Sequence, residues 1–214
     1  IAQALNYSIK PKPVADMAGW KQRLEAAREE YDNTPEDPAV TAERARLYEE
    51  NMCKDSYRDL IVQIRDHEDY FYQHCAGFYK NFWETVEYTL RDINDDGQEE
   101  LLLGCNGQAC DIWTIQEGKT QRTCGAAEGY LCQGNIYEIY QFTDGKPMHT
   151  YYRLLPDKGI ECVAQVAYGY GEWRLYDGQT DTEKIISEEE AQKIIASYVR
   201  IPLEMKPVSS FPME

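Results

Sequence analysis

The sequence has few of the residue patterns on which most enzyme and metal-binding families depend. Only 3 of its 214 residues are histidine, and it contains no H-E-x-x-H, G-x-S-x-G or G-x-x-x-x-G-K-[ST] motif. These absences leave no support for a zinc protease, a serine hydrolase of the nucleophile-elbow type or a P-loop nucleotide-binding protein. A hydrolase that uses carboxylates remains open, and so does a cysteine–histidine nucleophile pair, which cysteines oxidised to disulfides would disfavour.

Positive charge and long apolar runs are also scarce. The 22 Lys and Arg residues face 38 Asp and Glu residues, which gives a net charge of −16. Such a field repels phosphate backbones and anionic membrane surfaces, so we expect no nucleic-acid partner. No apolar run approaches the roughly 18 residues that a membrane-spanning helix needs, so no transmembrane segment is predicted in this chain.

The chain also lacks an initial methionine, and it begins at Ile1. We therefore expect an exported protein whose signal segment, and any lipid anchor, lie upstream of Ile1. An extracellular or cell-surface location follows from this expectation.

Cysteine is abundant by contrast, with seven residues, but no C-x-x-C pair is present. This spacing favours disulfides in an exported protein over a zinc site. If a hairpin is centred on Glu117, Cys110 and Cys124 face each other across two strands and are candidates for a disulfide. The alternative is that both are small buried strand residues whose register is displaced by one, which places them on opposite faces.

The periodicity of apolar residues predicts an α+β fold. Helical spacing over 14–31, 39–52 and 56–75 makes residues 1–82 an N-terminal helical region. Trp20, Leu24, Leu60, Ile61 and Ile64 are expected to pack this region against a sheet. Residues 83–214 then form a β-rich domain.

Within that domain, aromatic-rich runs alternate with the turns QEGK, TDGK, PDKG and YDGQ. This pattern is typical of an antiparallel β-meander, for which we expect six to eight strands. Ser187 and Glu190 form a capping box that begins one C-terminal helix at about residue 187.

The most informative stretch is YTLRDINDDGQEELLLG, residues 88–104. Alternate positions supply oxygen ligands from Asp92, Asn94 and Asp96, and Gly97 permits a sharp turn. The backbone carbonyl of Gln98 and the carboxylate of Glu100 would complete a calcium shell. An EF-hand is not indicated, because its twelfth position is a leucine here and strands flank the loop. The alternative is a β-turn whose acidic residues are merely solvated.

The core Y-x-L-x-D-[IL]-[ND]-x-D-G-x-x-E-L-L, followed by DIWTIQEGK, YEIYQFTDGKP and ISEEEAQKIIASYVRIPLEM, resembles a group of exported bacterial proteins. They are predicted lipoproteins typical of gut-dwelling Gram-positive bacteria, and the resemblance covers about residues 83–205. Asp95 stands where such loops commonly carry glycine. The resemblance implies a surface location and an architecture but no chemistry, because most members have no assigned activity.

Two classes of function are consistent with these features. The first is a surface-tethered, non-catalytic protein with a structural calcium loop and a protein or glycan ligand; the aromatic runs NIYEIYQF and YGYGEWRLY are candidate stacking surfaces for a glycan. The second is a small secreted hydrolase that uses carboxylates on the sheet, for which the candidates are Glu128, Glu138, Glu161 and Glu172.

Overall fold

The computed structural model describes residues 38–75, 81–126, 128–143, 146–156 and 159–213. By its contacts the chain divides into two compact units, residues 1–46 and 47–214. The domain boundary expected between residues 82 and 83 stays a prediction. The first unit is described only at residues 38–46, which are part of helix α2 (Pro38–Met52). The helix expected over residues 14–31 lies outside the described residues.

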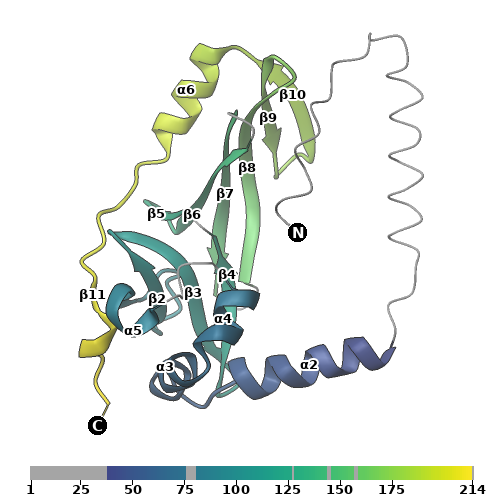
Figure 1. Ribbon diagram of the computed structural model, residues 1–214. Helices are drawn as coiled ribbons and strands as arrows, with labels where there is room; N and C mark the ends of the chain where they lie inside the picture. Colours follow the sequence, from purple (N-terminus) through teal and green to yellow (C-terminus); the bar gives the residue numbers. More distant parts are fainter. Residues whose placement is uncertain (1–37, 76–80, 127, 144–145, 157–158, 214) are drawn as a thin grey trace, which may run out of the picture. The chain divides into compact units, whose positions relative to one another are not determined.

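The α+β class is confirmed, and the strands of the second unit form two antiparallel sheets rather than one continuous meander (Figure 1). The first sheet has five strands in the order β11 (Lys206–Pro207), β1 (Glu87–Arg91), β2 (Glu100–Cys105), β3 (Gln108–Gln116) and β4 (Lys119–Gly125). The second sheet has six strands in the order β10 (Thr182–Ile186), β9 (Glu172–Asp177), β8 (Gly159–Gly169), β7 (Lys146–Leu155), β6 (Ile136–Thr143) and β5 (Gly129–Cys132).

Three short helices precede the first sheet: α3 (Tyr57–Asp66), α4 (Glu68–His74) and α5 (Phe82–Thr85). Ser56 begins α3 by accepting a hydrogen bond from the backbone N–H of Asp59 at 3.1 Å. The single helix expected over 56–75 is wrong, because the backbone leaves the helical region at His67, with φ −129° and ψ 39°. Helix α6 (Glu188–Ser197) and a 3₁₀ turn, η3 (Val208–Ser210), lie in the C-terminal part.

Helices α3 to α5 cover one face of the first sheet. Leu60, Ile61 and Ile64 are fully buried in one cluster with Trp113 of β3. The spacing of three and four residues places these α3 side chains on one helical face, so the helix buries an apolar stripe against the strand. The predicted packing is confirmed for these three residues, whereas Trp20 and Leu24 lie outside the described residues.

The opposite face of the first sheet meets the second sheet. Leu102 of β2 and Ile112 of β3 are fully buried in one cluster with Tyr137 of β6 and Leu154 of β7. The hydroxyl of Tyr137 donates to the backbone carbonyl of Ala109 at 2.7 Å, which satisfies a buried polar group between the two sheets. One end of this inter-sheet cluster opens into the pocket described below.

Helix α6 packs on the second sheet through Ala191, in a cluster with Val166 and Ile186. The hydroxyl of Ser187 caps the helix by accepting from the backbone N–H of Glu190 at 3.1 Å, as the capping box predicts. In the described part of the chain no helix is long and apolar enough to cross a membrane.

Candidate functional site

The loop at residues 92–99 joins β1 to β2, which are antiparallel neighbours in the first sheet. The alternation of apolar and polar residues in β1 and the leucines of β2 specify these strands, so the acidic residues fall between them, as the sequence predicts. The side chain of Tyr57 on α3 reinforces the exit from the loop, because its hydroxyl donates to the carbonyls of Glu99, at 2.9 Å, and Trp113, at 3.2 Å.

The acidic side chains shape the loop through its own backbone. The carboxylate of Asp92 accepts from the N–H groups of Asp95, at 2.8 Å, and Gly97, at 3.0 Å. Asn94 Oδ1 accepts from the N–H of Asp96 at 3.0 Å, and Asp96 Oδ1 accepts from the N–H of Gln98 at 2.8 Å. Successive side chains are thereby turned toward the inside of the loop.

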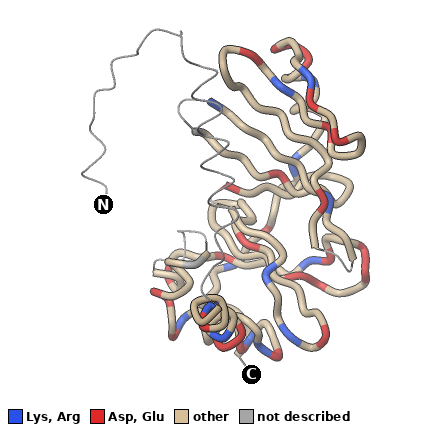
Figure 2. Tube along the Cα trace, turned by 90° about the vertical axis from the view of Figure 1, so that its right-hand side faces the viewer, with Lys and Arg blue, Asp and Glu red and all other residues tan. Residues whose placement is uncertain are grey.

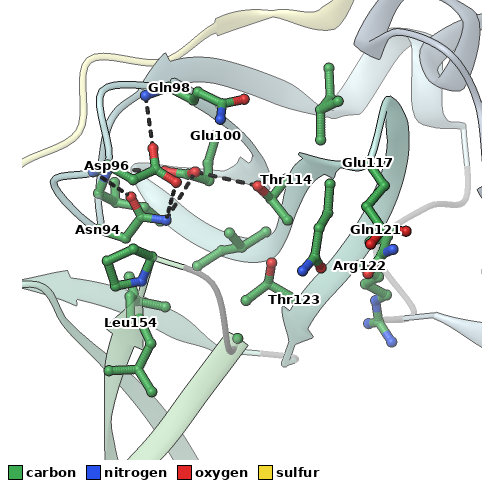
Figure 3. A pocket seen from close by; sticks show the side chains of 17 residues that line it. Asn94, Asp96, Gln98, Glu100, Thr114, Glu117, Gln121, Arg122, Thr123 and Leu154 are labelled. Carbon is green, nitrogen blue, oxygen red and sulfur yellow. Dashed lines mark hydrogen bonds between the residues drawn. The ribbon is translucent and has the colours of Figure 1, made fainter.

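Asn94, Asp96 and Glu100 point toward one another (Figure 3). Asn94 Nδ2 lies 3.3 Å from Asp96 Oδ2 and also 3.3 Å from Glu100 Oε1. The amide hydrogens thus stand between two carboxylates, where a cation would be most strongly attracted. Asp92 is tied to the backbone instead, and Gln98 enters the network through its N–H group.

Glu100, the first residue of β2, is buried at the end of the loop, with 2% of its surface exposed. Burial raises the pKa of this carboxyl group, and the neighbouring charges of Asp96 and Asp92 raise it further. The N–H of Ile93, which donates to Glu100 Oε2 at 3.0 Å, acts in the opposite direction. Among the described residues, no lysine or arginine pairs with Asp92, Asp96 or Glu100. The loop therefore holds negative charge that its own side chains do not balance.

The donor chemistry fits calcium. Every side-chain atom of the loop that could coordinate a metal is a carboxylate or amide oxygen, and hard divalent cations prefer such ligands. Calcium would require the amide of Asn94 to turn so that Oδ1 faces the ion. In the described part of the chain, no three His, Cys, Asp or Glu side chains gather closely enough to hold a metal ion between them. Asn94 and the carbonyl of Gln98 are thus needed to complete any shell.

A pocket of about 450 Å³ lies beside the loop (Figure 3). Asn94, Asp96 and Glu100 line one side of it, and Thr114, Gln121 and Thr123 continue the lining across β3 and β4. Leu154, Leu155 and Pro156 of the second sheet contribute an apolar wall.

The sequence analysis missed the strand residues of this pocket. Gln116 pairs with Lys119 around a two-residue turn, so Thr114 lies opposite Gln121 on the same face as Ile112. The signal in the sequence that could have revealed the pocket is that Thr114 and Gln121, which pair with each other, are polar on a face that is otherwise apolar. This signal can be recognised only when the register of the β3–β4 hairpin is known, and the turn residues alone do not establish that register.

The same register corrects the placement expected for the cysteines. The turn consists of Glu117 and Gly118, and a β-bulge beyond Ile112 sets this residue opposite Cys124. Cys110 and Cys124 therefore do not face each other directly, and all seven cysteines have free thiols in this structure. Burial raises the pKa of Cys110 to about 12 and that of Cys124 well above its ordinary range. A bridge between them stays a prediction.

Two of the four carboxylates proposed for a hydrolase, Glu138 and Glu172, are engaged in ion pairs. Glu138 is 2% exposed, and it accepts from Arg200 Nε at 2.7 Å and from Arg200 Nη2 at 3.0 Å. His149 Nδ1 lies 2.7 Å from the same carboxylate. Glu172 pairs with Arg174 at 2.6 Å. The second sheet thus uses these two glutamates in ion pairs.

Comparison of the chain with models of known protein families, with curated proteins and with solved structures gives no significant match.

Proposed function

We propose that this chain is an exported, non-catalytic binding protein whose loop at residues 92–100 holds a structural calcium ion. The observation that carries the proposal is the buried carboxylate of Glu100, which lies beside Asp96 and Asn94 without a basic partner among the described residues. Burial raises the pKa of Glu100 most, and the charges of Asp96 and Asp92 add to this effect; a divalent cation would offset both by favouring the ionised carboxylate.

Asp96, Glu100, the amide of Asn94 and the carbonyl of Gln98 would hold the ion with modest affinity, because only two of the carboxylates lie together in the loop. Extracellular calcium modules bind with dissociation constants of about 10⁻⁴ to 10⁻³ M, which suits the calcium concentration outside a cell. This chemistry, the seven cysteines and the resemblance of residues 83–205 to exported lipoproteins together support a location at the cell surface.

The partner that we propose is a protein or a glycan. Figure 2 shows that acidic residues are spread along the described chain, and the sequence carries a net charge of −16. Nucleic acid and anionic membrane surfaces are therefore unfavourable partners.

Calcium titration followed by thermal unfolding tests the loop. The wild-type melting temperature should rise by about 5–10 °C when calcium reaches roughly 100-fold its dissociation constant. Glu100→Gln should abolish this rise. Glu99→Gln is the matched control, because Glu99 is the adjacent residue and is exposed. An unchanged wild-type melting temperature in calcium would show that the loop is only a turn.

A second candidate function, a hydrolase that uses carboxylates, is favoured by one observation. Asp96 and Glu100 both line the pocket. Asp96 Oδ2 and Glu100 Oε1 each lie 3.3 Å from Asn94 Nδ2, so the separation of the two carboxylate oxygens is at most the sum of these two distances. Glycosidases place their two carboxyl groups about 5 to 10 Å apart, and one of the two has a raised pKa. Release of reducing sugar from neutral glycosides, lost in Glu100→Gln but kept in Glu99→Gln, would establish this alternative.

A further inference from the structure

The pocket beside the loop interrupts the core between the two sheets. Leu102 and Ile112 lie on the inward face of the first sheet and are fully buried. The next positions on that face are polar: Glu100 on β2, Thr114 on β3 and Gln121 on β4. Polar side chains on three adjacent strands thus face inward at one end of the inter-sheet core.

Two polar side chains of the lining, Gln121 and Thr123, have no hydrogen-bond partner within the described chain, and Thr114 has only a weak one. The hydroxyl of Thr114 reaches Glu100 Oε1 only at 3.5 Å, the limit of a hydrogen bond. The side chains of Gln121 and Thr123 are half-buried and form no hydrogen bond with another described residue. The amide of Gln121 and the hydroxyl of Thr123 are therefore available to a ligand or to water.

The opposite wall is different in character. Leu154 is buried, Leu155 is half-buried and Pro156 is exposed at the rim, and none of these side chains offers a hydrogen-bonding group to the pocket. A ligand that fits between these walls has a row of hydrogen-bonding groups along one edge and an apolar face on the other side. A saccharide ring has this form, with hydroxyls at its edge and C–H groups on its face.

The charge of the pocket lining limits the class of ligand further. Asp96, Glu100 and Glu117 contribute three negative charges to the lining, more than one bound calcium ion would neutralise, and Arg122 is paired with the buried carboxylate of Asp111 at 2.6 Å. Anionic ligands are therefore repelled, while the amide and hydroxyl groups of Gln121, Thr114 and Thr123 suit neutral hydroxyls. The volume of about 450 Å³ lies within the range of roughly 300–1,000 Å³ that is typical of small-molecule sites.

We propose that this pocket is the ligand site of the protein and that it binds a neutral saccharide, with Gln121, Thr123 and Thr114 as hydrogen-bonding partners. The inference rests on the proposed binding function and names the ligand class for it. Glu100 shapes the end of the pocket nearest the calcium loop. Leu154 and Leu155 pack against the apolar face of the ring.

The test is isothermal titration calorimetry of the full chain, in buffer with millimolar calcium, against a panel of neutral mono- and disaccharides. Matched panels of amino sugars and uronic acids report on charge. We expect at least one neutral saccharide to bind, with the uronic acids excluded. Gln121→Leu should weaken this binding about tenfold, as expected for the loss of one hydrogen-bonding side chain.

Two further variants keep the test specific. Thr123→Val changes little volume and should also weaken binding while leaving the melting temperature nearly unchanged. Gln141→Leu carries the same substitution on β6, where Gln141 is exposed and away from the pocket lining, and should bind as the wild type does. If no neutral saccharide binds, if only amino sugars bind, or if Gln121→Leu and Thr123→Val both bind normally, the inference is overturned.

Calcium titration and saccharide calorimetry together distinguish failure of the saccharide site from failure of the calcium loop. A calcium-dependent rise in melting temperature without saccharide binding would retain the calcium loop and overturn only the ligand class. Saccharide binding without a calcium effect would support the pocket and overturn the calcium loop. Cleavage of the bound saccharide would support the pocket but show that the protein is a hydrolase.

Discussion

Asn135 Nδ2 donates a hydrogen bond to Asp95 Oδ2 at 2.7 Å, and this contact joins the loop of the first sheet to the β5–β6 turn of the second. Both residues have left-handed backbone conformations, with φ of 61° for Asp95 and 59° for Asn135. Asparagine and aspartate tolerate this region better than other residues with side chains. An aspartate at a loop position where glycine is common thus contributes a contact that glycine would lack.

The first prediction concerns this contact. Asn135→Asp should lower the free energy of unfolding by roughly 0.5–1 kcal/mol, because two carboxylates would then meet at an exposed site. The substitution retains a residue that accepts the left-handed conformation, so backbone strain contributes little. Urea denaturation in chelator measures the effect.

The double variant Asp95→Asn with Asn135→Asp is the control, since it exchanges donor and acceptor while keeping their pairing. It should recover most of the lost stability. Equal losses in the single and double variants would show that the contact between the two side chains contributes nothing.

The second prediction concerns the pH dependence that Glu100 creates in metal-free protein. Its pKa is raised in the folded state by burial and by Asp96 and Asp92, so the folded state holds this proton more tightly than the unfolded chain does. The resulting stability is fully present below the ordinary glutamate pKa of about 4.3 and is lost as pH rises through the folded pKa. Chemical denaturation in chelator, from about pH 3.5 to about pH 8, measures this decline.

Glu100→Gln should remove this decline, so the variant should be more stable than wild type at neutral pH in chelator. Saturating calcium should reverse the order, because only the wild type retains the carboxylate ligand. Parallel pH profiles for the variant and the wild type would contradict the assigned role of Glu100.

The third prediction concerns the ion pair of Glu138 and Arg200. Burial alone would raise the pKa of Glu138, but hydrogen bonds from His149 and Arg200 outweigh it and lower the pKa. Arg200 also stacks on Tyr130, with its guanidinium carbon 3.5 Å from the ring centroid. The residue after Arg200 is bonded to β5, because the N–H of Ile201 donates to the carbonyl of Leu131 at 2.8 Å.

Arg200→Met should lower the free energy of unfolding by about 2–4 kcal/mol, because it leaves a buried carboxylate with less compensation. Since a lowered folded pKa gives stability that is lost as pH falls, the variant should lose less stability than wild type on acidification. Arg153→Met is the control, because Arg153 is exposed and should change stability by less than about 0.5 kcal/mol. A loss of similar size in both variants would contradict the role of the pair.

The sequence by itself determined the features that depend on neighbouring residues. The apolar spacing of Leu60, Ile61 and Ile64 specified a helical face, and Ser187 specified the start of α6. The alternation in β1 and the Asp92–Glu100 pattern placed an acidic loop between two strands. These features rest on contacts within a few residues, so periodicity and local hydrogen bonding are sufficient to predict them.

The tertiary structure alone decided what depends on pairing between distant residues. The division into two sheets, the bulge that sets Cys124 opposite Ile112, and the tie from Asp95 to Asn135 all depend on long-range register. The pocket is of the same kind, because Glu100, Gln121 and Leu154 come from separate strands. A shift of one residue in a strand moves each side chain to the other face, so the sequence pattern could not place these residues together.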